Sequence, residues 1–333
     1  MKSTTESSKT EKVKEGNLEI PRIVAVGASA GGLEALKSFF ENVAVGDKSA
    51  YIVIQHLSPD YKSMMGELLK KSTSLPIVEV KDQMRVKPGH VYLIPPANNL
   101  ILEDEILRLT EKPKNQTLNL PIDIFFESMA KQLKERAIGV VLSGTGSDGT
   151  RGVRAIKEND GMIMVQDPKD AKFDGMPKSA IRTGLVDYIL PVNKMGSELK
   201  NFISSPPIFH FKDGNVQYDE KELNNILKYI DENVGIDFRE YKYATLARRV
   251  ARRVNICKCG SLKEYFEFLT NSKKEVDILY REFLIGVTRF FRDDEVWNVL
   301  KSDVFPKLIE EKQDGDVLKV WDVACSTGEE AYS

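Results

Sequence analysis

The chain has 333 residues, of which 41% are hydrophobic and 29% are charged, and its formal net charge is -2. This length exceeds one ordinary core and predicts two domains plus a remnant. The small net charge excludes a general attraction to nucleic acid or to anionic membranes. No apolar run approaches the roughly 18 to 20 residues that a membrane span needs, so we expect a soluble protein.

The N-terminal residues 1–17 are polar and lack the apolar core of a signal peptide. They predict a disordered leader on a cytoplasmic protein. The three histidines and the three cysteines, Cys257, Cys259 and Cys325, form no four-ligand zinc spacing. We therefore predict free structural thiols and no metal site.

Residues 18–204 alternate short apolar runs with helical patterns, as in IVAVGAS followed by GLEALKSFFENV. This alternation predicts an α/β fold, a doubly wound and mostly parallel sheet with helices on both faces. The runs PIVEV, HVYLIPP and ILEDEILRL predict strands in an antiparallel excursion from the same sheet. Residues 205–220 contain two prolines and no sustained period, so we expect a linker there.

Ser29 lies directly after an apolar run and directly before a helical pattern, in Val-Gly-Ala-Ser-Ala-Gly-Gly. Glycines around a serine at this junction permit a tight turn that exposes the hydroxyl group. Two other roles for this segment are possible: Ser29 could cap the following helix, or the glycines could form a turn that binds the phosphate of a dinucleotide. The second requires an acidic residue about 20 positions onward, where the chain has Gln55 and His56.

His56 and Asp148 are also predicted to follow strands. His56 comes after the apolar run YIVI, and Asp148 lies in SGTGSDG after the run IGVVL. Parallel strands deliver their carboxyl ends to one edge of the sheet, where open α/β sheets place their ligands. Ser29, His56 and Asp148 together are a candidate nucleophile, base and orienting carboxylate for acyl transfer.

Five blocks in this region resemble the catalytic domain of the CheB-type chemotaxis protein-glutamate methylesterases. They are GASAGGLEAL, VIQHLSPDYKSMMGELL, PGHVYLIPPANN, VVLSGTGSDGTRG and QDPKDAKFDGMPKSAIRTGLVD. The resemblance implies hydrolysis of glutamyl methyl esters on chemotaxis receptors, with deamidation of receptor glutamines. It assigns Ser29, His56 and Asp148 as the catalytic residues, with no cofactor. The family's best-known members have an N-terminal receiver domain, for which the leader is too short.

From residue 221 to residue 307 the pattern is helical and predicts a small all-α domain. This region, with FLIGVTRFFRDDEVW and VWDVACSTGEEAYS, resembles the CheR-type receptor methyltransferases. The resemblance implies that Thr288, Arg292 and Glu329 contact S-adenosylmethionine; Gly286 stands where many members have asparagine. Residues 308–333 are expected to begin a Rossmann-like cofactor domain with one strand-turn-helix unit. Because that domain is incomplete, we expect little methyl transfer.

A group of arginines lies beside the apolar positions of one predicted helix: Arg248, Arg249, Arg252 and Arg253. Two interpretations stay open, a solvated helix face and a surface that docks to acidic receptor helices. Nucleic-acid binding is disfavoured because no aromatic residues are interleaved with these arginines.

The leading hypothesis is therefore a receptor methylesterase fused to an incomplete methyltransferase, with the cytoplasmic helices of chemotaxis receptors as partners. The alternative is a catalytically silent module that docks a larger signalling fusion to receptors. An assay of ester hydrolysis distinguishes the two.

Overall fold

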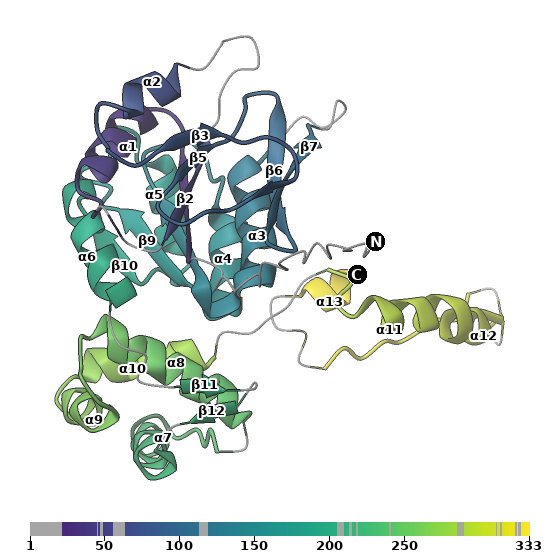
Figure 1. Cartoon of the computed structure of the whole chain (residues 1–333). Helices are drawn as coiled ribbons and strands as arrows, with labels where there is room; N and C mark the ends of the chain where they lie inside the picture. Colours follow the sequence, from purple (N-terminus) through teal and green to yellow (C-terminus); the bar gives the residue numbers. More distant parts are fainter. Residues whose placement is uncertain are drawn as a thin grey trace, which may run out of the picture. The chain divides into compact units, whose positions relative to one another are not determined.

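The computed structural model describes residues 22–333 except for several short segments: 45, 47–48, 56–63, 113–118, 205–209, 213–214, 218, 240, 285–289, 311, 314, 324 and 326–327. The chain divides into two compact units, Met1–Ser205 and Pro206–Ser333 (Figure 1). Each unit has its own hydrophobic core.

The first unit is built on a parallel sheet, as the alternation of apolar runs and helices predicted. Its strand order is β10-β9-β8-β1-β2-β5-β3. Among the described residues, seven strands take part: β1 Ile23–Ala28, β2 Ala50–Gln55, β3 Ile77–Glu79, β5 Val91–Leu93, β8 Ala137–Val141, β9 Met162–Gln166 and β10 Tyr188–Leu190.

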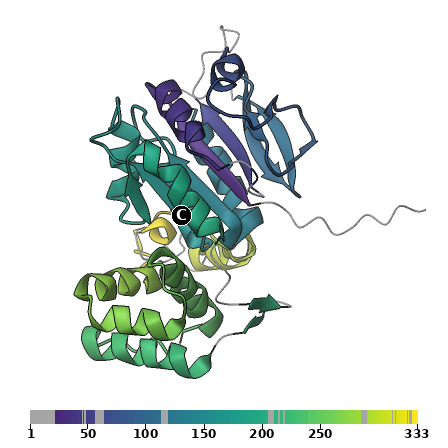
Figure 2. The same ribbon diagram turned by 60° about the vertical axis from the view of Figure 1, so that its left-hand side comes forward.

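Helices cover both faces of this sheet (Figure 2). One face carries α1 (Gly32–Glu41), α2 (Met65–Leu69) and α6 (Val192–Ser204). The other carries α3 (Pro121–Leu133), followed by the 3-10 turn η1 (Lys134–Arg136), then α4 (Thr150–Glu158) and α5 (Gly175–Arg182). The doubly wound α/β prediction is confirmed.

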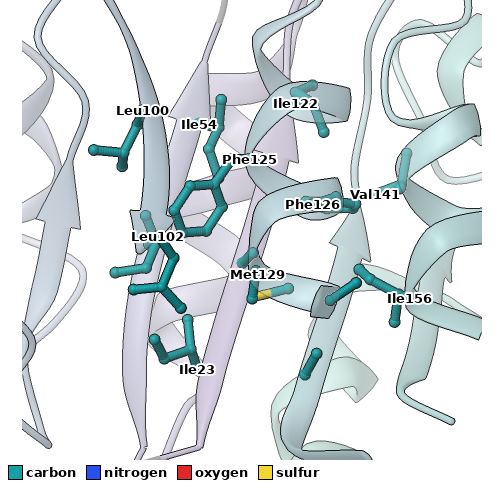
Figure 3. Packing of buried hydrophobic residues seen from close by; sticks show 14 of the residues in the cluster. Ile23, Ile54, Leu100, Leu102, Ile122, Phe125, Phe126, Met129, Val141 and Ile156 are labelled. Carbon is teal, nitrogen blue, oxygen red and sulfur yellow. The ribbon is translucent and has the colours of Figure 1, made fainter. Parts of the chain in front are cut away.

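Side chains of the central strand β1 alternate between the two cores. Ile23 and Ala25 belong to the core beneath α3 and α4, whereas Val24 and Val26 belong to the core beneath α1 and α6. Figure 3 shows the first of these cores, in which Phe125 and Met129 of α3 lie over the sheet. A strand buried on both faces explains why IVAVGA is a continuous apolar run.

The expected antiparallel excursion is wrong in part. β3 and β5 pair in parallel within the main sheet. The antiparallel hairpin of β6 (Asn98–Glu103) and β7 (Ile106–Glu111) instead forms a separate small sheet with β4 (Met84–Arg85). The hairpin packs against α3 because its apolar side chains are buried in the same core, namely Leu100, Leu102 and Leu107.

The second unit contains a helical bundle of α7 (Glu220–Val234), α8 (Tyr243–Ile256), α9 (Leu262–Thr270) and α10 (Lys273–Phe283). Local signals set the ends of these helices. Ser261 and Ser272 accept hydrogen bonds from the N–H groups of Glu264 and Glu275, and Gly235 ends α7 with a φ of 76°. These are the side-chain N-caps and left-handed C-cap that such sequences favour.

A short hairpin of β11 (His210–Lys212) and β12 (Asn215–Gln217) lies in the stretch for which we expected a linker. After the bundle come α11 (Asp294–Val299), the π-helical turn η2 (Leu300–Val304), α12 (Phe305–Glu310) and α13 (Glu329–Tyr332). Residues 308–333 were expected to begin with the strand of a strand-turn-helix unit, but the described residues of this region contain no strand. A single strand needs a neighbour with which to pair its backbone groups, and no described strand pairs with this segment.

Candidate active site

Ser29 lies at the carboxyl end of β1, in the turn that leads into α1. Its N–H donates to the carbonyl oxygen of Ser143 at 2.9 Å, and its own carbonyl oxygen accepts the N–H of Gly32 at 2.8 Å. Gly31 has a φ of 67°, and a Cβ there would lie 3.0 Å from the Lys172 Cβ and the Ser143 Oγ. Only glycine fits this left-handed and crowded position. Glycine at position 31 therefore permits the turn that leads from Ser29 into α1.

The loop after β8, residues 143–149, lies against the serine turn. The Ser143 hydroxyl donates to the carbonyl oxygen of Ala30 at 2.9 Å, and the Ser143 N–H donates to Oε1 of Gln166 at 2.8 Å. A Cβ on Gly144 would lie only 3.0 Å from the Cβ of Ser29. The two loops thus hold each other at one edge of the sheet.

Asp148 is 5% exposed and lies at the N-terminus of α3. Its Oδ2 accepts the N–H of Ile122 at 3.1 Å, and its Oδ1 accepts the N–H groups of Asp123 and Gly149 at 3.0 and 2.9 Å. Both carboxylate oxygens of Asp148 are therefore held by backbone donors in a buried position.

A second buried carboxylate, Asp123, neighbours Asp148 and was not singled out from the sequence. Its Oδ1 accepts the N–H of Gly152 at 2.8 Å, and its Oδ2 lies 3.5 Å from Nε of Arg151. Burial raises the pKa of Asp123 to about 6; the Gly152 hydrogen bond opposes this shift and the charge of Asp148 adds to it. Two carboxyl groups thus lie close together at the N-terminus of α3.

His56 itself lies outside the described residues, so its contacts are not part of this geometry. The strand before it is described: Gln55, the last residue of β2, pairs with Ala28, the last residue of β1. β1 and β2 thus end at the same level of the sheet. The structure brings Ser29 and the loop of Asp148 together at that edge.

Backbone N–H groups near Ser29 are candidates to bind an oxyanion. The N–H of Gly144 is excluded, because it donates to the carbonyl oxygen of Phe173 at 3.0 Å. The N–H groups of Ala30, Thr145 and Gly146 donate to no acceptor in the described part of the chain. They remain available to a substrate oxygen at the Ser29 edge.

In the second unit, Thr288 lies outside the described residues, whereas Arg292 is described and exposed and Glu329 is described and half-buried. The hydroxyl of Ser333 accepts the N–H of Phe291 at 2.8 Å and donates to the carbonyl oxygen of Glu329 at 2.6 Å. Arg292 and Glu329 therefore come from segments that lie side by side. Gly328 precedes α13 with a φ of 100°.

Three of the four arginines of α8 are buried and do not form a solvated face, whereas Arg248 is half-buried. Arg249, Arg252 and Arg253 are 6%, 5% and 6% exposed. Arg249 donates to the carbonyl oxygens of Glu282 and Phe283, and Arg252 pairs with the Glu282 carboxylate. These side chains cannot reach a partner, so both interpretations drawn from the sequence are wrong for them.

Arg253 forms a two-pronged ion pair with Glu275, with both N–O distances 2.8 Å, and the Tyr265 hydroxyl donates to the same carboxylate. Burial would lower the pKa of Arg253, but the hydrogen bonds and charge of Glu275 raise it above its ordinary value. The reason for the burial of α8 arginines is thus the set of acceptors on α10.

Within the described residues no group of three or more His, Cys, Asp or Glu side chains could hold a metal ion. No helix of the described chain is both long and apolar enough to cross a membrane. Cys257, Cys259 and Cys325 are free cysteines.

Three family models match the chain. The model described as CheB methylesterase matches residues 24–199, more than half of the sequence. The model of the CheR methyltransferase all-alpha domain matches residues 221–284, and that of the CheR methyltransferase SAM binding domain matches residues 286–333.

Individual proteins give the same picture. A 104.1 kDa protein of Rhodobacter capsulatus is 39% identical over 81% of this chain and 30% of its own length. A protein-glutamate methylesterase/protein-glutamine glutaminase 1 of Myxococcus xanthus is 35% identical over 54% of each protein. The crystal structure of the Thermotoga maritima CheB methylesterase catalytic domain is 30% identical with a TM-score of 0.51, covering 54% of this chain and 97% of that domain. The chain spans about half or less of these curated relatives.

Proposed function

Because the chain belongs to the CheB methylesterase family, we propose that it hydrolyses glutamyl methyl esters on chemotaxis receptors and deamidates receptor glutamines. We assign residues 18–204 to the esterase domain and residues 205–220 to the linker. We assign residues 221–307 to the all-α domain and residues 308–333 to the domain that binds S-adenosylmethionine. The relatives named protein-glutamate methylesterase/protein-glutamine glutaminase support this activity.

The observation that most favours hydrolysis is the pairing of the Ser29 turn with the loop of Asp148 at the carboxyl edge of the sheet. In the proposed mechanism the Ser29 hydroxyl attacks the ester carbonyl carbon while His56 takes its proton. His56 then protonates the departing methanol, and a water molecule hydrolyses the acyl-enzyme by the same route. Asp148 orients the imidazole and stabilises its charged form.

The tetrahedral intermediate places a negative charge on the former carbonyl oxygen. We assign its stabilisation to the N–H groups of Thr145, Gly146 or Ala30, which are free to donate within the described structure. Preorganised backbone donors of this kind favour the transition state because they need no reorganisation.

For the second unit we propose that Thr288, Arg292 and Glu329 bind S-adenosylmethionine. The exposed guanidinium of Arg292 suits the carboxylate of that cofactor, and the Glu329 carboxylate suits its hydroxyl or cationic groups. When bound, S-adenosylmethionine supplies an electrophilic methyl group. Gly328, with its positive φ, lets the backbone approach the ligand closely.

The proposed partners are the cytoplasmic helices of methyl-accepting chemotaxis receptors, and we propose that the chain acts in the cytoplasm. Neither nucleic acid nor membrane insertion is required, since the net charge is -2 and the described helices include no membrane span.

The decisive experiment measures methanol release from methylated chemoreceptor membranes by the wild-type chain and by Ser29→Ala. Loss of the nucleophile should lower the rate by at least about a thousandfold. Ser197→Ala is the matched control, because that hydroxyl only donates to the carbonyl oxygen of Lys194 on α6. A tenfold or smaller loss in Ser29→Ala would exclude Ser29 as the nucleophile.

A further inference from the structure

Asp123 and Asp148 form a reciprocal pair of helix caps: Asp148 caps α3, and Asp123 caps α4. Asp148, just before α4, accepts hydrogen bonds from N–H groups in the first turn of α3. Asp123, in that first turn of α3, accepts the N–H of Gly152 in the first turn of α4. The close approach of the helices requires Gly152, since a Cβ there would lie 2.4 Å from the Phe126 Cβ. The two carboxylates therefore join the starts of α3 and α4 on either side of the same contact.

A helix cap alone does not require a buried charge at position 123. Asparagine or serine would also accept the Gly152 N–H, without the desolvation cost of a carboxylate that is 1% exposed. The charged groups that face Asp123 are Asp148 before α4, Arg151 on α4 and Glu127 one turn further along α3. Arg151 lies between Asp123 and Glu127, 3.5 Å from an oxygen of each.

We propose that Asp123 is a positioning residue for ester hydrolysis and acts through Asp148. Its carboxylate fixes the first turn of α4 against α3 through the Gly152 N–H, directly after the 143–149 loop that carries Asp148, and its negative charge adds to that of Asp148. This inference rests on the proposed function, since it requires that Asp148 orient His56. Asp123 touches no reacting atom in this scheme.

The consequence is a specific pH dependence. The pKa of Asp123 is raised to about 6 by burial, so its charge is lost as the pH falls through that value. Histidine ordinarily titrates near 6.5, so the acid limb of the pH–rate profile then reports coupled groups rather than one base. Protonation of Asp123 weakens the charge-assisted bond to Gly152 and removes negative potential near the base, and both effects slow hydrolysis.

The first test is the pH profile of methanol release by Asp123→Asn, which keeps an oxygen acceptor for Gly152 and removes the charge. We expect kcat to fall roughly threefold to tenfold with KM unchanged, because the substrate does not contact this residue. The acid limb should become shallower and move to lower pH by about half a unit.

Arg151→Gln is the second variant, and it does not perturb the core because the Arg151 side chain is 63% exposed. Removal of this cation raises the pKa of Asp123, so the acid limb should move to higher pH, opposite to the effect of Asp123→Asn. Arg154→Gln removes the same charge from an exposed position on α4 that is not among the charges acting on Asp123. Its profile should match that of the wild type.

The outcomes separate the two proposals. Opposite displacements of the acid limb in Asp123→Asn and Arg151→Gln support the positioning role. If methanol release depends on Ser29 but both variants reproduce the wild-type acid limb, the positioning role is wrong and the proposed function stands. If the wild type shows no release that depends on Ser29, the proposed function fails and this inference fails with it.

Discussion

Gly144 lies so close to Ser29 that a side chain at position 144 would force its neighbours to move. A Cβ there would lie 3.0 Å from the Ser29 Cβ and 2.1 Å from Sδ of Met176. The second contact involves the flexible end of a side chain, but the first involves the base of the proposed nucleophile. The absence of a side chain at Gly144 therefore allows the two active-site loops to meet.

We predict that Gly144→Ala lowers the rate of methanol release by roughly threefold to tenfold, because Ser29 must move by a few tenths of an ångström and a displacement of about 1 Å at a nucleophile costs about a hundredfold. Overpacking should also reduce the free energy of unfolding by about 1–3 kcal/mol. Gly89→Ala is the control: its φ is 68°, but a Cβ there meets nothing within 4 Å. If Gly144→Ala kept the wild-type rate, the described contact between the loops would be unimportant for hydrolysis.

Asp148→Asn should impair both activity and stability. The amide NH2 group would face at least one of the N–H groups of Ile122, Asp123 and Gly149 that the carboxylate now accepts. A buried N–H group without an acceptor costs about 1–3 kcal/mol, which thermal unfolding would measure. Loss of the orienting charge should lower kcat by about a thousandfold or more.

Asp82→Asn is the matched control for that substitution. Asp82 accepts the N–H of Leu109 through one oxygen at an exposed site, and asparagine can do the same. We expect a wild-type rate and a nearly unchanged melting temperature. Asp148→Asn with full activity would remove Asp148 from the mechanism.

Local sequence pattern predicts one part of this site and misses another. Ser29 follows a continuous apolar strand and precedes a helix with a glycine turn, so its placement was visible in the local pattern. Asp123 was not, because nothing in PIDIFF indicates that a carboxylate in the first turn of one helix caps a second helix 29 residues onward. Such pairings exist only after the helices pack.

The arginines of α8 illustrate the same limit in the second unit. Periodicity correctly indicated the helix and its apolar face, which includes Leu246 and Val250. It could not show that the carboxylates of Glu275 and Glu282 and the terminal carbonyls of α10 lie opposite the arginines. A run of charges on a helix favours a solvated face unless partners elsewhere in the chain compensate for burial.

The raised pKa of Asp123 predicts a pH-dependent change in stability. The carboxyl binds its proton more tightly in the folded chain, with a pKa of about 6 against 3.8 for the ordinary group. Its stabilising contribution is present below pH 3.8 and is lost as the pH rises through 6. Above pH 6 the buried charge therefore costs up to about 3 kcal/mol relative to the protonated form.

Asp123→Asn has no such titration, so its free energy of unfolding should improve relative to that of the wild type as the pH rises from 4 to 7. Denaturant unfolding of both proteins across this range measures the difference. A constant difference would show that Asp123 titrates normally. If Asp123→Asn is more stable but less active than the wild type at pH 8, the charge at position 123 serves activity and is not needed for folding.

The ion pair of Arg253 and Glu275 allows a test of whether the two units are independent. Glu275→Ala leaves the buried guanidinium without its carboxylate and the Tyr265 hydroxyl without its acceptor. Removal of one partner from a buried pair typically costs about 3–5 kcal/mol. We expect the helical bundle of the second unit to unfold at a lower temperature, as followed by calorimetry or limited proteolysis of the whole chain.

Methanol release by Glu275→Ala should stay at the wild-type rate at temperatures below this transition, because the sheet of the first unit has its own cores. Glu232→Ala is the control, since its pair with Lys228 is exposed and 3.7 Å long, and such pairs contribute at most about 0.5 kcal/mol. If esterase activity declined in parallel with the bundle, the first unit would require the second for its stability, and the two could not be treated as separate folding units.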